Sequence, residues 1–285
     1  MFVPTADTTD SVDSTATTAD TASVDSIIAN RPTLTVPSLV QIRDILAQLE
    51  APIISALTER LQLATDSSLY SNNGAKLKAF LGAIELADGA LGRYAYGKLE
   101  YPYVATALAP SPDKTSKSVT FPAGRFHQDS FTGNSNLTAF YLQTLVPLFN
   151  STTAYYYHLD NSTVDPAAIF HADATLLQLL SHRAHIGKIV AETKFAGNVT
   201  GYTPLIQAGD DTSIRVLLTN TTQEAGVLAQ ASTAATSFSN AWVGSGALVS
   251  TQFASNLQNA AAKVFRELID ITTEIEIQYL LARFN

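Results

Sequence analysis

One stretch of twenty residues decides the fold: Leu176-Leu-Gln-Leu-Leu-Ser-His-Arg-Ala-His-Ile-Gly-Lys-Ile-Val-Ala-Glu-Thr-Lys-Phe195. Strong helix formers, an apolar stripe with helical spacing and the absence of proline predict one long helix that ends at Phe195. Arg183 and Lys194 are eleven residues apart. Three helical turns separate them, so their side chains share a face about 16 Å apart along the axis. Such a face is either an anion site or a solvated surface, and the stretch alone favours neither.

Composition indicates a folded protein with a lightly charged surface. Of 285 residues, 46% are hydrophobic and 15% are charged, which suffices for a sizeable core in one large or two small domains. A net charge of −8 disfavours nucleic acid and anionic membranes as partners. No apolar run is long enough for a transmembrane helix. The absence of cysteine excludes disulfides, and the five histidines lack zinc-site spacing, so we expect no metal.

The first 33 residues differ from the rest of the chain. They are rich in Ser, Thr, Ala and Asp, with no apolar period, and we interpret residues 1–33 as a flexible acidic leader. Residues 34–285 are then one helical domain, in which residues 104–134 form a long surface loop rich in Pro, Ser, Thr, Gly and Asp.

Localisation is suggested by N-glycosylation sequons. Met1-Phe-Val-Pro does not begin a signal peptide. If the protein is secreted, its signal peptide was removed before this sequence begins. About half of the sequons would arise by chance in a chain this rich in Ser and Thr, but with the low Lys content they favour a secreted over a cytoplasmic protein. The sequons begin at Asn136, Asn150, Asn161, Asn198 and Asn220.

The remaining apolar periods also predict helices. No segment alternates like a strand, because the β-branched runs lie within helical periods, and the predicted fold is an all-α helical bundle. Ser38 is expected to cap the first helix, Pro52 to kink it, and Thr219 or Thr221 to cap the helix after residue 218. The predicted helices span residues 38–63, 75–93, 136–149, 167–195, 202–208, 213–218, 219–242 and 249–284.

Four of these helices carry polar residues among apolar neighbours. Burying one such residue costs about several kcal/mol unless it is paired, so several together suggest a polar ligand inside the bundle. The residues are Arg43; Arg183 with Lys194; Asn220 with Glu224; and Thr272 with Glu276.

Four blocks of sequence surround these residues: Ile42-Arg43-Asp44 with Glu50, residues 180–195, residues 218–224, and residues 271–283. Together they resemble the all-helical AroQ class of chorismate mutases, in its eukaryotic, fungal-type branch. The resemblance covers roughly residues 38–285, and its second and fourth blocks are specific.

The resemblance implies a homodimeric isomerase that rearranges chorismate to prephenate without a cofactor. Arg43 and Arg183 would bind the two substrate carboxylates, since guanidinium groups pair with carboxylates through two hydrogen bonds. Lys194 and a protonated Glu276, whose pKa burial near another acid would raise, would donate to the ether oxygen of the breaking bond. Gly187 would leave room for the substrate ring. Residues that would bind the hydroxyl and a carboxylate or orient the donors are Asn220, Glu224 and Thr272.

The sequence also departs from regulated members of the family. Where those carry Gly-Ser before the long helix and Arg-Arg after the second helix, this chain has Ala167-Ala168 and Gly92-Arg93. We therefore expect no strong control by tyrosine or tryptophan, which fits a secreted member. We also expect Asn220 to be unmodified because its helix buries it. The alternative function is a catalytically retired, secreted effector or binding protein, but such proteins lose pocket residues first.

Overall fold

The computed structural model describes residues 37–63, 66–94, 100–104, 107, 129, 131–150, 164–244 and 251–284. They belong to the unit of the chain that spans Thr35–Asn285. All regular structure in these ranges is helical, as predicted. The predicted leader and most of the 104–134 loop lie outside the described residues.

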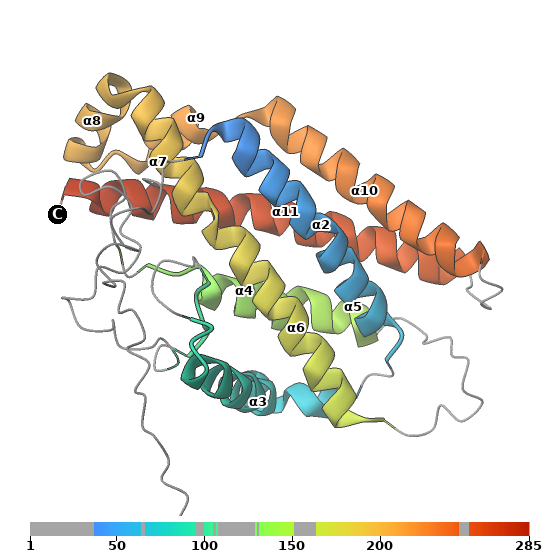
Figure 1. Ribbon diagram of the computed structural model, residues 1–285. Helices are drawn as coiled ribbons and strands as arrows, with labels where there is room; N and C mark the ends of the chain where they lie inside the picture. Colours follow the sequence, from blue (N-terminus) through green and yellow to red (C-terminus); the bar gives the residue numbers. More distant parts are fainter. Residues whose placement is uncertain are drawn as a thin grey trace, which may run out of the picture. The chain divides into compact units, whose positions relative to one another are not determined.

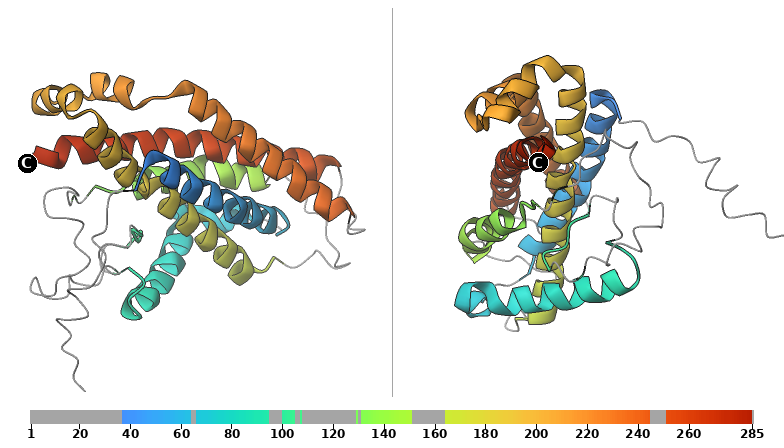
Figure 2. Two further views of the ribbon diagram at one scale, coloured as in Figure 1. Left: turned by 45° about the horizontal axis from the view of Figure 1, so that its top comes forward. Right: turned by 90° about the vertical axis from the view of Figure 1, so that its left-hand side faces the viewer.

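The longest described helix, α11 (Thr251–Leu281), is a common neighbour of several other helices (Figure 1). It packs against α2 (Leu39–Leu61), α6 (Pro166–His185), α7 (Gly187–Gly197) and α10 (Thr221–Gly244). Figures 1 and 2 show α10 running beside α11, while α2 also contacts α6 and α10. Helices from both ends of the chain therefore meet along α11.

Shorter elements complete the bundle. The segment η3 (Tyr141–Leu145) is π-helical and joins α4 (Asn134–Phe140) to α5 (Val146–Asn150), so the predicted helix over 136–149 forms from three pieces. No helix among the described residues meets the length and apolarity needed to cross a membrane. The shorter elements are η1 (Ser67–Tyr70), α3 (Ser71–Ala90), α4 (Asn134–Phe140), α5 (Val146–Asn150), α8 (Val199–Ala208), α9 (Asp211–Leu218) and η4 (Ala282–Phe284).

Local sequence explains where several helices begin. Ser38 caps α2 as predicted, since its hydroxyl accepts from the backbone N–H of Gln41 and the Gln41 side chain accepts from the backbone N–H of Ser38. Asp165 caps α6 and Asp210 caps α9, each through a side-chain oxygen that accepts from one or two backbone N–H groups of the first turn. Pro52 lies inside α2 without ending it.

The prediction of one continuous helix through residue 195 was wrong at one point. The chain forms α6 and α7, separated at Ile186, although Ile186 keeps helical dihedrals (φ −58°, ψ −21°). The next residue, Gly187, faces α11: a Cβ there would lie 2.7 Å from Cγ2 of Thr272 and 3.2 Å from its carbonyl oxygen. Gly187 thus permits close packing of α7 on α11, and this replaces the expectation that it leaves room for a ligand.

A buried ion pair ties α2 to α6. The Arg60 and Asp173 side chains are 0% exposed, with Nε of Arg60 2.5 Å from Oδ1 of Asp173. The hydroxyls of Tyr70 and Tyr141 donate to the same carboxylate at 2.6 and 2.5 Å. Tyr70 also accepts from Arg60 at 2.8 Å. Both charges are therefore satisfied without water.

We expect Asp173→Asn to lower the free energy of unfolding by about 3–5 kcal/mol, because it leaves the buried Arg60 charge uncompensated. Asp88→Asn is the matched control. It breaks a partly exposed pair with Arg93 (2.6 Å; side chains 29% and 41% exposed), which is worth at most about 1 kcal/mol. Urea unfolding measures the free energy of unfolding of both variants. Equal losses of stability would contradict the claim that the buried ion pair contributes more than the exposed one.

Candidate active site

All seven polar residues singled out from the sequence line one cavity. It lies among side chains of α2, α6, α7, α10 and α11 and has a volume of about 680 Å³, including the part open to solvent. Leu39, Ile42, Leu46, Val190 and Val227 supply apolar walls. Side chains of residues up to 233 positions apart in the sequence thus line the same cavity. Their chemical roles remain predictions. The seven are Arg43, Arg183, Lys194, Asn220, Glu224, Thr272 and Glu276.

Arg183 is a buried cation with unused donors. It is 4% exposed, its Nη2 lies 3.9 Å from Oε1 of Glu50, and its guanidinium carbon lies 5.1 Å from the centre of the Phe265 ring. Within the described part of the chain its Nε has no hydrogen-bond partner. Burial lowers the pKa of Arg183 to about 10, against the opposing effect of Glu50, so the group stays charged at neutral pH. Such a group is suited to binding a carboxylate.

Lys194 and Glu276 form the second charged pair. Nζ of Lys194 donates to Oε2 of Glu276 at 3.0 Å and to the carbonyl oxygen of Leu218 at 2.8 Å. Burial raises the pKa of Glu276 to about 7; Lys194 opposes this shift and the Glu224 carboxylate adds to it. Near neutral pH, Glu276 is therefore protonated in a large fraction of molecules and can then donate a hydrogen bond.

Arg43 and Asn220 lie at the exposed side of the cavity. Nη2 of Arg43 donates to Oε1 of Gln223 at 2.8 Å. Oδ1 of Asn220 accepts from the backbone N–H of Gln223 at 3.0 Å, so Asn220 itself caps α10 and the predicted threonine caps were wrong. Asn220 is exposed, so the expectation that its helix buries it was also wrong. Burial consequently gives no reason for this sequon to stay unmodified.

Thr272 contributes a further unpaired polar group. Its Oγ1 is buried and has no hydrogen-bond partner among the described residues. A buried hydroxyl without a partner is costly, so a ligand group that pairs with it would be favoured. Together with Nε of Arg183, the cavity therefore offers two unsatisfied polar atoms.

Comparisons with known proteins show what the whole chain is similar to. No family model matches the sequence. The chorismate mutase of Saccharomyces cerevisiae is 27% identical over 268 residues, which cover 88% of this chain and 97% of that protein. The solved chorismate mutase of Candida albicans, in complex with L-Trp, superimposes with a TM-score of 0.68 at 25% identity, over 87% of this chain and 92% of that one. The chloroplast chorismate mutase of Zea mays superimposes with a TM-score of 0.64 at 26% identity, over 88% and 97%.

The chain is a homologue of the fungal and plant chorismate mutases. The predicted all-α bundle of the AroQ chorismate mutase type is thereby confirmed.

Two site residues were missed from the sequence. Gln223, the partner of Arg43, could have been found because it is three residues after Asn220 and so lies on the same side of α10. Glu50 was named only as part of the first sequence block, and its place beside Arg183 had no sequence signal.

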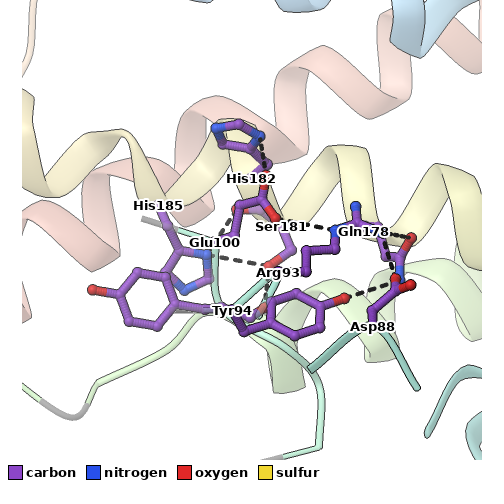
Figure 3. A network of polar contacts seen from close by, with 9 residues as sticks. Asp88, Arg93, Tyr94, Glu100, Gln178, Ser181, His182 and His185 are labelled. Carbon is purple, nitrogen blue, oxygen red and sulfur yellow. Dashed lines mark hydrogen bonds and ion pairs between the residues drawn. The ribbon is translucent and has the colours of Figure 1, made fainter. Parts of the chain in front are cut away.

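A second polar cluster joins the end of α3 to α6 (Figure 3). Arg93, the arginine of the Gly92-Arg93 pair, donates to Asp88 at 2.6 Å, to Glu100 at 3.1 Å and to Gln178 at 3.4 Å. His182 also lies 3.8 Å from Glu100. The Arg93 guanidinium is therefore engaged by groups of its own chain.

Proposed function

We propose that the protein is a chorismate mutase, which rearranges chorismate to prephenate without a cofactor. The observation that carries the proposal is one cavity that holds two guanidinium groups, Arg43 and Arg183, together with the Lys194–Glu276 pair. A dianion fits this charge pattern: the cavity lining has three cations against Glu224 and Glu276, and the excess becomes two positive charges once Glu276 is protonated.

The arginines would select the reactive shape of the substrate. Chorismate carries two carboxylates, and the reaction requires its two arms to come together. Arg183 is held by packing on Phe265 and by Glu50, so its position is set before the substrate arrives. Binding both carboxylates at fixed points lowers the barrier by removing conformational freedom.

Lys194 and Glu276 would stabilise the transition state. As the ether C–O bond breaks, negative charge develops on the ether oxygen, and donors in a cavity that excludes water stabilise it most. The ammonium of Lys194 and the protonated carboxyl of Glu276 are 3.0 Å apart, so one oxygen can accept from both. Asn220, Glu224 and Thr272 would bind the remaining polar groups of the substrate.

We expect Lys194→Ala and Arg183→Ala each to lower kcat/KM for chorismate by at least about 10²–10³-fold, the usual cost of losing a donor to developing charge or a substrate clamp. Lys263→Ala, which removes an exposed cation from α11, is the control and should leave turnover unchanged. A spectrophotometric assay of chorismate consumption measures all three. Near-normal turnover by either site variant would contradict the assignment, and an inactive wild type would favour the retired binding protein.

We expect activity to fall as pH rises through about 7, because Glu276 donates only when protonated and its pKa is raised to about 7. Glu276→Gln donates at every pH and should extend activity toward high pH. Profiles of kcat/KM against pH for the two proteins test this, and identical profiles would refute the role of Glu276.

We further propose that tyrosine and tryptophan exert no strong control. Arg93 is engaged within its chain, and the backbone N–H groups of Ala167 and Ala168 donate to the Asp165 carboxylate at 2.9 and 3.1 Å. Adding tyrosine or tryptophan at increasing concentration should change the reaction rate by less than about twofold. Allosteric coupling usually changes the affinity for the substrate by about fivefold or more. A larger effect of either amino acid would contradict the proposal.

Secretion and a homodimeric state are further proposals. Four of the five sequon asparagines, Asn136, Asn150, Asn198 and Asn220, are exposed, which would allow glycosylation of a secreted protein, while Asn161 lies outside the described residues. The homodimer rests on family resemblance. Glycopeptide mapping and sedimentation of protein from the native secretion medium test both, and a glycan on Asn220 of active protein would argue against the site as described.

A further inference from the structure

Two helices of this chain begin with the same local pattern but use it differently. In α2, Gln41 follows the cap residue Ser38 by three positions, and its side chain accepts from the Ser38 backbone N–H at 2.9 Å. In α10, Gln223 follows the cap residue Asn220 by three positions. Its side chain instead accepts from Arg43 of α2 at 2.8 Å. The usual capping contact is therefore replaced by a contact that crosses to another helix.

The orientation of the Gln223 amide is fixed by chemistry. A guanidinium group has only donors, so Oε1 of Gln223 must face Arg43 and Nε2 must face away. The two N–H groups of Nε2 have no partner among the described residues, and Gln223 lines the cavity beside Arg43 and Glu224. One amide can thus accept from Arg43 and still donate to a ligand.

We propose that Gln223 is a substrate-positioning residue: it holds the guanidinium of Arg43 over the cavity and donates to the substrate carboxylate that Arg43 binds. The inference rests on the proposed chorismate mutase function. Arg43 is exposed, and Gln223 is its hydrogen-bond partner within the described chain. An exposed arginine otherwise loses conformational freedom when it binds, and Gln223 restricts that freedom in advance.

The neutrality of Gln223 is part of the inference. A neutral acceptor orients Arg43 without cancelling its charge, so the full attraction for a carboxylate remains. An acid at the same place would pair with Arg43 and would also repel a dianionic substrate.

The test compares Gln223→Met, Gln223→Glu and Gln230→Glu. Met has a similar length but no hydrogen bond, Glu keeps the acceptor and adds a charge, and exposed Gln230 places the same charge farther along α10. We expect KM for chorismate to rise about three- to tenfold in Gln223→Met, because the ordering of Arg43 is lost. In Gln223→Glu it should rise more than about tenfold, as expected for a like charge beside the ligand. Gln230→Glu should match the wild type. In both Gln223 variants kcat should change less than KM, since Arg43 itself is still present to hold the carboxylate once the substrate is bound.

Thermal unfolding separates this role from a structural one. A carboxylate at position 223 strengthens the contact with Arg43 and suits a helix N-terminus, so Gln223→Glu should be at least as stable as the wild type, and Gln223→Met less stable. The stability order is then opposite to the order of substrate binding. A KM for Gln223→Glu equal to or below that of Gln223→Met, in an active wild-type background, would overturn this inference alone. A wild type that does not consume chorismate would overturn the proposed function and this inference with it.

Discussion

The close packing of α7 on α11 is the constraint on which the site depends. Gly187 allows the two helices to approach, because any side chain there would meet Thr272. Seven residues along α7, this approach places Lys194 at 3.0 Å from Glu276. Beyond the pair, the buried Glu192 carboxylate accepts from the hydroxyl of Tyr279 at 2.6 Å and also pairs with Arg283. The Lys194–Glu276 pair thus lies between a close helix contact on one side and a buried ion pair on the other.

Two buried arginines show how the same side chain serves stability or binding. Arg60 is 0% exposed, and its donors reach Asp173 and Tyr70 at 2.5 and 2.8 Å. Arg183 is nearly as buried, but its Nε is unpaired and its acid, Glu50, is 3.9 Å away. Because an unsatisfied buried charge is costly, it is retained where a ligand completes its bonding. The difference between the two arginines therefore favours the cavity beside Arg183 as the candidate binding site, independently of any resemblance.

Each cation of the cavity is held by a partner suited to its task. Arg183 is packed on an aromatic ring and faces an acid, Lys194 contacts an acid whose pKa is raised to about 7, and Arg43 contacts a neutral amide. When Glu276 is protonated, the positive charge of Lys194 is no longer balanced by it. In the proposed mechanism, protonation of Glu276 would make the cavity more positive and would supply the second donor in one step. This coupling makes pH the natural variable with which to study the site.

The sequence by itself determined that the chain is helical and which polar residues lie among its apolar stripes, because helical periodicity and capping depend on near neighbours. Mainly through the family resemblance, it also identified the candidate residues of a single site: Arg43, Arg183, Lys194, Asn220, Glu224, Thr272 and Glu276. Only the tertiary structure decided the contacts between distant segments: Arg43 with Gln223 at a separation of 180 residues, Arg183 with Glu50, and Gly187 with Thr272. The interruption at Ile186 and the exposure of Asn220 likewise depend on what packs against each residue, whereas the raised pKa of Glu276 was already expected from the family resemblance. No local pattern of the chain carries that information.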